Sequence, residues 1–352
     1  MGAIGIVYAL AGIGAGVVLL FAYSTVQFLT FHFVTPSEPL KKYKRIAGET
    51  NTAFALITGA SAGIGLGIAK ELARQGFGVV MLGHLADELS EAAAEVRKLL
   101  PPTGSAAGSN ENRVRTLVMD ARTATPTDLE AAVASLSDVP LTILVNNVGG
   151  NPVAVPPFRP LATYSCDDVD AVINQNARFM ARLTALLLPV LEGRRHGQQD
   201  QPSDKSHRSL IISLSSAAHI GLPWLVMYSA TKAFNRALGF SLARELPTVQ
   251  SPSAVPIDSI VVTPGEVLSQ GNSRGVPASA PTAAEFGRAI VHKADGAVAR
   301  GWMEMRAHWW HDVEDVLVRM APEGPRRQGI VQQVGAKRVA WNRVYEEEAK
   351  RE

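Results

Sequence analysis

The stretch SLIISLSSAAHIGLPWLVMYSATKAF, residues 209–234, passes from an apolar segment through a serine-rich turn into a helical pattern. Residues 210–212 have the continuous apolar character of a strand buried in a parallel sheet. Pro223 interrupts the connection, and the following helix carries Tyr228 and Lys232 four residues apart on one face. The stretch therefore predicts a strand and a helix that bring hydroxyl groups, a phenol and an amine together.

Tyr228 and Lys232 are suited to acid–base chemistry. An ammonium group stabilises a phenolate, so Lys232 is expected to lower the pKa of Tyr228 from about 10 towards neutral. Ser215, thirteen residues before Tyr228, could supply a hydroxyl to the same carbonyl group. Two residues at this spacing also occur by chance on surface helices, so the rest of the sequence has to decide between the two interpretations.

Composition narrows the class of protein. Of 352 residues, 47% are hydrophobic and 19% charged, which is typical of a globular chain with some membrane content. The net charge of +2 provides no large basic field, so nucleic-acid binding is not implied. Because Cys166 is the single cysteine, an intrachain disulfide and a cysteine-based zinc site are ruled out. The sequence contains no HExxH motif, so no metal site is predicted. His308 and His311 are expected at a surface or an interface.

The N-terminus predicts a transmembrane anchor over residues 1–36. Residues 1–37 contain no Asp, Glu, Lys or Arg, and this run exceeds the roughly 20 residues needed to cross a bilayer. The run lacks the basic start and the short apolar core of a secretory signal, so an uncleaved anchor is favoured. Four basic residues follow it: Lys41, Lys42, Lys44 and Arg45. By the positive-inside tendency they place the large domain in the cytosol.

Residues 53–82 follow the order strand, glycine turn, helix, strand. The turn has the pattern TGxxxGIG, formed by Thr58, Gly59, Gly63 and Gly65. Glycine lets the backbone come close to a pyrophosphate, and the N-terminus of the next helix offers N–H groups to that anion. Because the turn lies between an apolar strand and a helix, dinucleotide binding is favoured over a tight turn in some other α/β protein.

The second strand, residues 78–85, bears on the choice of cofactor. It ends without the Asp or Glu that would hold the 2′-hydroxyl of NAD, and His84 stands near that end, with Ser61 in the glycine loop. The absence of an acid favours NADP(H), although no arginine for the 2′-phosphate follows the strand either.

The remaining chain continues the alternation of strands and helices, which specifies a doubly wound parallel sheet with its ligand at the carboxyl ends of the strands. A helix after the third strand is expected to be capped by Thr127. Another helix carries Asn174 and Asn176, one of which should face the interior because apolar residues flank the pair. The strands are expected to end in or run into Asp120, Asn146, Asn147, Gly149, Pro264, Gly265, Val267 and Ser269. Residues 192–207 have the composition of a surface insertion.

The motifs TGASAGIG, NNVG, INQN, S-x12-YSATK and PGEVLS, in this order, resemble the short-chain dehydrogenase/reductase superfamily over about residues 53–269. The N-terminal span, LVNNVG, INQN and the Trp-rich tail are similar to its endoplasmic-reticulum group. That group contains very-long-chain 3-oxoacyl-CoA reductases and their 17β-hydroxysteroid dehydrogenase relatives. The resemblance implies an α/β Rossmann-type doubly wound parallel sheet with an N-terminal transmembrane helix and a helical C-terminal extension.

The resemblance also implies roles for individual residues. Tyr228 would protonate the developing alkoxide, and Lys232 would lower its pKa and hold the nicotinamide ribose. Ser215 would orient the substrate carbonyl, with Ser216 as the neighbouring alternative, and Asn176 would hold a water in the proton relay. Asp120 would meet the adenine, Asn147 the adenosine ribose, and Val267 and Ser269 the carboxamide end, while the family's arginine after the second strand appears here as His84. The implied NADP(H) site comprises Thr58, Gly59, Ser61, Gly63, Ile64, Gly65, His84, Asp120, Asn147, Tyr228, Lys232, Val267 and Ser269.

Three segments are expected: the anchor (residues 1–36), a short-chain dehydrogenase Rossmann domain (residues 51–270), and a substrate lid with the C-terminal extension (residues 271–352). A helix with Trp309 and Trp310 in the extension is expected to be interfacial, to form a substrate wall, or to pack on the sheet's edge.

The expected function is NADPH-dependent reduction of a lipid-type ketone, namely the 3-oxoacyl-CoA step of very-long-chain fatty acid elongation. The expected location is the endoplasmic reticulum membrane, with the catalytic domain facing the cytosol. A homo-oligomer or elongation-complex partners are further expectations. The alternatives are a steroid, retinol or specialised-metabolite dehydrogenase, or a non-catalytic membrane-anchored binding protein. The last alternative is disfavoured because all four implied catalytic positions carry the required residue types.

Overall fold

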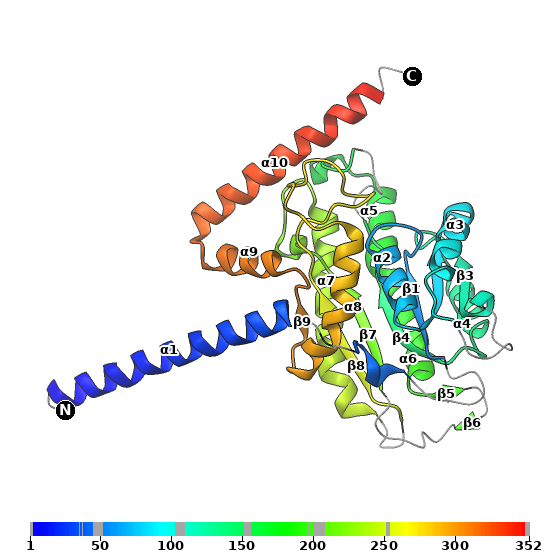
Figure 1. Cartoon of the computed structure of the whole chain (residues 1–352). Helices are drawn as coiled ribbons and strands as arrows, with labels where there is room; N and C mark the ends of the chain where they lie inside the picture. The colour runs from blue at the N-terminus through cyan, green and yellow to red at the C-terminus, as the bar shows by residue number, and fades with distance from the viewer. Residues whose placement is uncertain are drawn as a thin grey trace. The chain divides into compact units, whose positions relative to one another are not determined.

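A computed structural model describes residues 3–34, 36, 38–44, 52–102, 110–150, 156–195, 198–199, 208–250 and 254–348 (Figure 1). The chain divides into two compact units, Met1–Ser37 and Glu38–Glu352. Among the basic residues expected to orient the anchor, Arg45 lies outside the described residues, as does most of the expected surface insertion at residues 192–207.

The first unit consists of one apolar helix, α1 (Ala3–Phe33). Its segment Ile4–Phe33 has a mean hydropathy of 2.4. At 1.5 Å per residue this segment is roughly 45 Å long, which exceeds the ~30 Å of bilayer hydrocarbon. Its length and composition therefore suit a membrane span.

A parallel sheet of seven strands organises the second unit, in the order β3-β2-β1-β4-β7-β8-β9. Its strands are β1 (Phe54–Thr58), β2 (Gly78–Gly83), β3 (Val114–Val118), β4 (Leu141–Asn146), β7 (Ser209–Leu214), β8 (Ile257–Val262) and β9 (Glu304–Met305). The strand order reverses between β1 and β4, which opens a crevice at their carboxyl ends. The predicted doubly wound sheet is confirmed.

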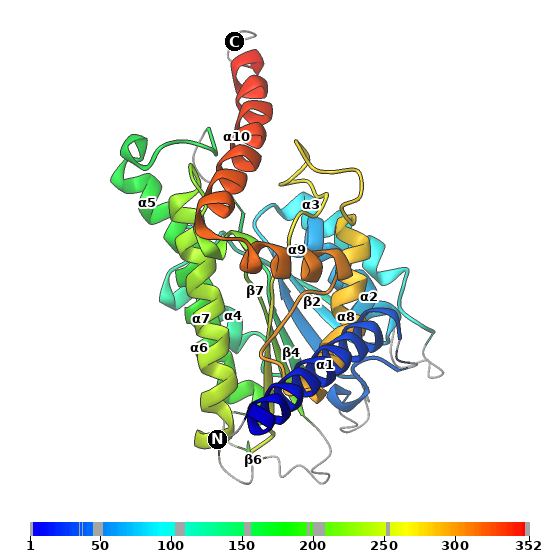
Figure 2. The ribbon, with the colours of Figure 1, turned by 90° about the vertical axis from the view of Figure 1, so that its left-hand side faces the viewer.

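Helices cover both faces of this sheet (Figure 2). One layer contains α2 (Gly63–Arg74), α3 (Ala86–Arg97) and α8 (Ala283–Ala299). The other contains α4 (Pro126–Ala134), α6 (Phe179–Leu191) and α7 (Val226–Val249). α5 (Cys166–Ile173) runs through a π-helical turn, η5 (Asn174–Arg178), into α6, and α9 (Trp309–Met320) and α10 (Glu323–Glu348) follow β9. The short elements are η1 (Lys41–Tyr43), η3 (Asn110–Arg113), η4 (Leu161–Thr163), η6 (Ala217–Ile220) and the hairpin of β5 (Arg194–Arg195) and β6 (Gln198–Gln199).

The core follows from the apolar strands. Strands β1, β2, β4 and β7 are buried along their whole length, as expected where helices cover both faces of a sheet. On the side of α6 and α7, strand residues such as Leu56 and Ile211 pack with Leu183, Leu187 and Leu246 in one buried cluster. This packing holds the carboxyl ends of β1, β4 and β7 in fixed positions around the crevice.

The cap of α4 differs from the prediction. Thr125, not Thr127, is the N-cap, because its hydroxyl accepts from the Asp128 amide and Asp128 returns a bond to the Thr125 amide. Pro126 occupies the first turn, where a missing N–H has no cost. The prediction of Thr127 was wrong because this capping box needs an acidic side chain three residues after the cap, and Asp128 has that position relative to Thr125.

The layered sheet continues past residue 270, where the sequence placed the end of the Rossmann domain. Helix α8 packs so closely on α2 that a Cβ on Gly287 would lie 2.6 Å from the carbonyl carbon of Gly67. A hydrogen bond of 2.8 Å between the His292 Nε2 and the carboxylate of the buried Glu71 joins the same two helices. Strand β9 has only two residues, too few for a periodic pattern to indicate a strand.

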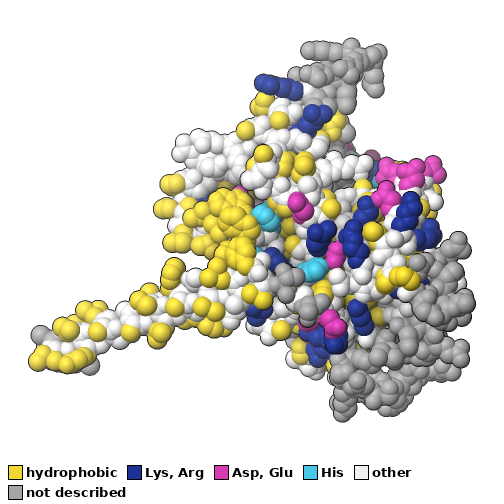
Figure 3. Space-filling view, viewed as in Figure 1, with side chains coloured by type: hydrophobic (Ala, Val, Ile, Leu, Met, Phe, Trp, Pro, Cys, Tyr) yellow, Lys and Arg dark blue, Asp and Glu magenta, His cyan; other side chains and the backbone are white. Residues whose placement is uncertain are grey.

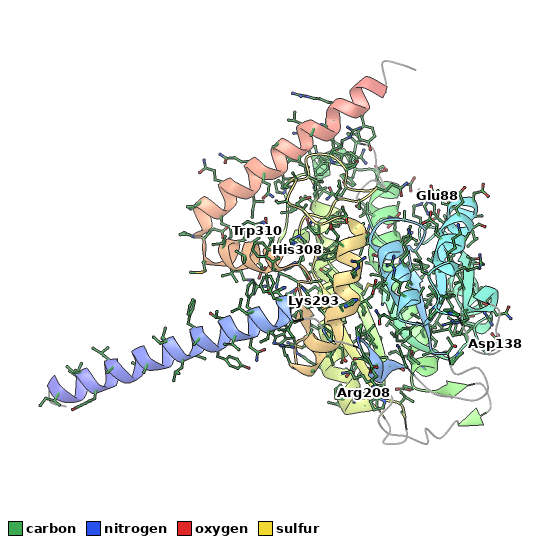
Figure 4. All side chains as sticks on the ribbon, viewed as in Figure 1. Glu88, Asp138, Arg208, Lys293, His308 and Trp310 are labelled. Atoms are coloured by element: carbon green, nitrogen blue, oxygen red, sulfur yellow. The ribbon has the colours of Figure 1, made fainter. Side chains whose placement is uncertain are left out.

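The first residues of the second unit, 38–44, are held against its sheet and helices. Tyr43 is fully buried, and its hydroxyl donates to Asp258 at 2.9 Å. Arg208 binds the same carboxylate through two nitrogens, at 2.6 and 2.8 Å (Arg208 is labelled in Figure 4). Lys42 forms an ion pair of 2.7 Å with Asp295. Part of the basic charge that was expected to orient the anchor therefore also ties this segment to the body of the protein.

The contact between α2 and α8 gives a stability prediction. We expect Gly287→Ala to lower the free energy of unfolding by about 1–3 kcal/mol, because backbone atoms of α2 cannot yield to the new methyl group. Gly296→Ala in the same helix is the matched control, since its Cβ would meet only the flexible end of Arg300. It should be neutral or stabilise by up to about 1 kcal/mol through helix propensity. Urea denaturation measures both variants, and equal stabilities would refute the packing argument.

Candidate active site

Helix α7 places Tyr228 and Lys232 at the crevice. Lys232 is 4% exposed, and its Nζ donates to the carbonyl of Leu214, the last residue of β7, at 3.4 Å. The same Nζ lies 5.6 Å from the centre of the Tyr228 ring. Burial lowers the pKa of Lys232 to about 8 because the interior disfavours its charged form. The predicted pair is thus brought together inside the protein, not on an exposed helix face.

The pKa of Tyr228 moves in the opposite direction from the expectation. Burial of the phenol raises it, a hydrogen bond with the Ser216 hydroxyl lowers it, and the carboxylate of Glu266 raises it further. The Lys232 ammonium lies 5.6 Å from the centre of the ring, and the pKa of Tyr228 is raised in spite of this cation. Tyr228 is therefore protonated at neutral pH, which is the state needed to donate a proton.

The two serines after β7 face different partners. Ser215 is 2% exposed, and its hydroxyl donates to the carbonyl of Lys232 at 2.7 Å. Ser216 is half-buried, and its Oγ accepts from the Ala218 amide at the start of η6 at 3.2 Å. Its hydroxyl is also close enough to the phenol to lower the pKa of Tyr228. The structure thus places Ser216, the alternative in the sequence, beside the phenol. Ser215 braces the backbone of α7.

The π-helical turn η5 carries Asn176, which is fully buried. Its Oδ1 accepts from the Gly150 amide at 2.9 Å, and its Nδ2 donates to the Val172 carbonyl at 3.1 Å. A Cβ on Gly149 would lie 2.8 Å from both Asn176 Oδ1 and Lys232 Nζ, so both groups flank this glycine. The expectation that one of the two asparagines faces the interior is confirmed, and a π-turn at a functional position is a known pattern.

The glycine loop is joined to the end of β4. The Thr58 hydroxyl accepts from the Asn147 and Val148 amides at 2.9 and 3.0 Å. The Asn147 side chain donates to the Gly59 carbonyl at 3.1 Å. A Cβ on Gly65 would lie 2.1 Å from that same carbonyl oxygen, so no other residue fits there. Thr58 and Asn147 therefore shape the loop through their own hydrogen bonds, a role the sequence did not reveal.

One cavity of about 1020 Å³ joins many of the predicted residues. Those that line it are Ile64, Asn147, Ser215, Ser216, Tyr228, Lys232, Val267 and Ser269. Five segments far apart in sequence thus meet in one hollow, at the strand ends where a dinucleotide binds in this fold. The remaining predicted residues, Thr58, Gly59, Ser61, Gly63, Gly65, His84, Asp120 and Asn176, do not line it. Asp120 instead pairs with Arg122 at 2.7 Å, and His84 is exposed at the carboxyl end of β2.

The C-terminal helices form a wall of the cavity that the sequence did not predict in detail. Lys337 of α10 forms an ion pair with Glu266 at 2.6 Å, and Arg338 donates to the Phe158 carbonyl at 3.3 Å. His311 of α9 is 4% exposed and bonded to the Glu266 carbonyl oxygen at 3.0 Å. The expected surface position of His311 is therefore wrong. Burial lowers the pKa of His311 to about 4, which makes the ring neutral at physiological pH.

A sequence profile described as short chain dehydrogenase matches residues 53–276. The chain belongs to the short-chain dehydrogenase/reductase family. Its members are oxidoreductases that use NAD(P)(H), which agrees with a glycine loop, a Tyr–Lys pair and a cavity between them.

Relatives and solved structures point the same way. The chain is 27% identical over 303 residues to a very-long-chain 3-oxoacyl-CoA reductase of Scheffersomyces stipitis, covering 85% of this chain and 80% of the relative. It is 26% identical over 317 residues to a reductase of the same name from Mycosarcoma maydis, covering 84% of each. The fold matches a short chain dehydrogenase of Pseudomonas syringae with a TM-score of 0.60 at 20% identity, covering 78% of this chain and 100% of that one. It also matches a short-chain dehydrogenase from Sphingobium yanoikuyae in complex with NADPH (TM-score 0.54, 22% identity, coverage 77% and 97%).

Gly149 gives a test of the site's geometry. We expect Gly149→Ala to weaken nicotinamide-cofactor binding by at least about tenfold, because its methyl group would displace Lys232 or Asn176. Gly221→Ala is the matched control, since Gly221 also has a positive φ (+92°, against +151° at Gly149) but its Cβ would meet nothing within 4 Å. Fluorescence titration with the cofactor measures both variants. Equal losses would mean that backbone strain, not the crowded site, is responsible.

Proposed function

We propose that this protein is an NADPH-dependent reductase of long-chain 3-oxoacyl-CoA. The observation that carries the proposal is the meeting of Tyr228, Lys232 and Ser216 in a cavity that continues under the C-terminal helices. The names of the relatives support the choice of acyl-CoA within a family with many substrates.

In the proposed carbonyl reduction, each of these residues has a separate role. The bound cofactor supplies hydride. Tyr228 donates its proton to the carbonyl oxygen as negative charge develops there, and the Ser216 hydroxyl donates a hydrogen bond to the same atom. The charge of Lys232 then favours the resulting phenolate. Asn176 lies next to Lys232, across Gly149, where a water could return a proton to the pair.

The preference for NADPH rests on the end of β2. This strand ends at Gly83 and is followed by His84, so no carboxylate stands there to bind a 2′-hydroxyl or to repel a 2′-phosphate. His84 is exposed and can turn towards a phosphate. The glycine loop and the start of α2 fit the pyrophosphate through their backbone N–H groups.

The preference for a long chain rests on the apolar part of the cavity beside α10. An apolar cluster there contains Phe158, Leu225 and Val334, with Ile330 and Trp341 packed against it. All five of these side chains line the cavity. Such a wall gains about 0.8 kcal/mol for each CH₂ that it removes from water.

A chain-length series tests the function. With purified full-length protein in detergent and NADPH, kcat/KM for 3-oxoacyl-CoAs should rise by up to about fourfold for each added CH₂ until the cavity is full. NADH should support slower turnover, and Tyr228→Phe should abolish turnover while cofactor still binds. A flat series, or activity restricted to ketosteroids or retinal, would remove the acyl-CoA assignment and favour the alternative dehydrogenases. A Tyr228→Phe variant with wild-type kcat would remove the proposed catalytic site.

The two serines make a separate test. Ser216→Ala should lower kcat by roughly 10²-fold, because a hydrogen bond to the developing oxyanion is lost. Ser215→Ala should lower the free energy of unfolding by about 1 kcal/mol and change kcat only a few-fold, because its hydroxyl is bonded to Lys232. Steady-state kinetics and thermal unfolding of both variants provide the comparison. The reverse order of the kinetic effects would return the substrate-orienting role to Ser215.

We further propose that residues 1–36 anchor the enzyme in the endoplasmic reticulum membrane with residues 38–352 in the cytosol. The proposal rests on α1 and on the names of the relatives. We propose residues 51–270 as the catalytic domain, completed by α8 and β9, with α9 and α10 as a wall of the cavity. Association with a second copy or with elongation enzymes is proposed on the same basis. Protease added outside intact microsomes should digest the large unit, and protection of that unit would invert the topology.

A further inference from the structure

Helix α9 turns apolar side chains towards solvent. Trp309, Trp310, Val316, Leu317 and Met320, which we call the α9 apolar face, are 42%, 39%, 52%, 57% and 78% exposed. At 100° per residue their positions fall within about a third of the helix circumference. Figure 3 shows hydrophobic side chains gathered where α9 lies in Figure 1, and Figure 4 labels Trp310 on this helix.

The polar side of α9 is the side that contacts the protein. His311 is buried against the Glu266 carbonyl. Asp315 forms an ion pair of 2.8 Å with Arg306, which directly follows β9 and whose side chain is 10% exposed. Asp312 lies 3.7 Å from the same guanidinium. A soluble amphipathic helix does the opposite and packs its apolar stripe on the core. The hydrophobic effect therefore favours an apolar partner on the outer side of α9.

We propose that the α9 apolar face inserts into the headgroup region of a phospholipid bilayer. Two adjacent tryptophans suit this depth because an indole combines an apolar ring with a polar N–H. Guanidinium groups follow the face in sequence, on Arg326 and Arg327 of α10, and can reach lipid phosphates. Arg326 also pairs with Glu323. Arg319 is on the polar side of α9, where it forms an ion pair of 2.8 Å with Asp315. The same chain carries α1, whose length and composition suit a bilayer.

The α9 apolar face is continuous with the cavity. Leu317 belongs to the face and also lines the cavity, together with Val318 on the same helix and Val331 on α10. A bilayer seated on the face would thus adjoin the apolar part of the cavity. We infer that an apolar chain passes from lipid into the cavity between α9 and α10. This second step rests on the proposed function, whereas the seating on lipid does not.

Tryptophan fluorescence tests the seating directly. All five tryptophans of the chain are at or beyond residue 224, and α1 has none, so lipid quenching reports on the large unit alone. Full-length protein is reconstituted in phosphatidylcholine vesicles, with and without bromine atoms near the top of the acyl chains. We expect brominated lipid to quench the emission, Trp309→Phe with Trp310→Phe to remove most of that quenching, and Trp302→Phe to retain it. Absence of quenching in the unchanged protein, or equal quenching in both variants, would overturn the proposal.

Introducing negative charge on the α9 apolar face is a second test of the lipid contact. Val316→Asp with Met320→Asp should reduce the quenching, and should lower kcat/KM for a vesicle-borne long-chain 3-oxoacyl-CoA about tenfold. Turnover of a short water-soluble 3-oxoacyl-CoA should stay unchanged, since neither residue lines the cavity. Val249→Asp, at another exposed valine, is the matched control and should change neither readout.

The outcomes separate the two proposals. Quenching without activity on any 3-oxoacyl-CoA would remove the proposed function and leave the lipid contact established. If lipid does not quench and Val316→Asp with Met320→Asp instead halves the particle mass in detergent, the face binds a second copy and the lipid proposal is wrong.

Discussion

The buried ammonium of Lys232 is the constraint around which the site is built. Removing a cation from water costs several kcal/mol, so its surroundings must present dipoles or counter-charge. Here the Leu214 carbonyl lies at 3.4 Å, and Asn176 Oδ1 flanks the same small glycine as the ammonium. Gly149 leaves room for both groups, and Ser215 ties the Lys232 carbonyl to the end of β7. The π-helical turn with Asn176, Gly149 and Ser215 therefore all help to position the Lys232 ammonium.

Glu266 links the end of the central sheet to the C-terminal helices α9 and α10. Its carboxylate binds Lys337 of α10 and the side-chain amide of Asn272, while its carbonyl binds the buried His311 of α9. Val267, which lines the same cavity, follows Glu266 directly in the chain, so one residue contacts both C-terminal helices and the loop expected at the nicotinamide. The ion pair between Lys337 and Glu266 is therefore a direct contact between α10 and the segment that continues into Val267.

Much of the fold could be predicted because local periodicity records how each element is buried. The apolar run of β7, the turn between β1 and α2, and the alternation of strands and helices each needed only neighbouring residues. Short elements could not be predicted in this way, because the two residues of β9 are too few to show a periodic pattern. The cap of α4 was misplaced because a reciprocal pair of hydrogen bonds, and not one favourable residue type, selects Thr125.

By itself, then, the sequence determined the doubly wound sheet, the glycine loop, the apolar length of α1 and the pairing of Tyr228 with Lys232 on one helix. The three-dimensional fold was needed to show that burial raises the pKa of Tyr228, that Ser216 is close enough to oppose this rise, and that His311 is buried. It also decided that α9 turns its apolar side outward. These features depend on which distant elements meet and how much water they exclude, and the spacing of residues along one element contains neither quantity.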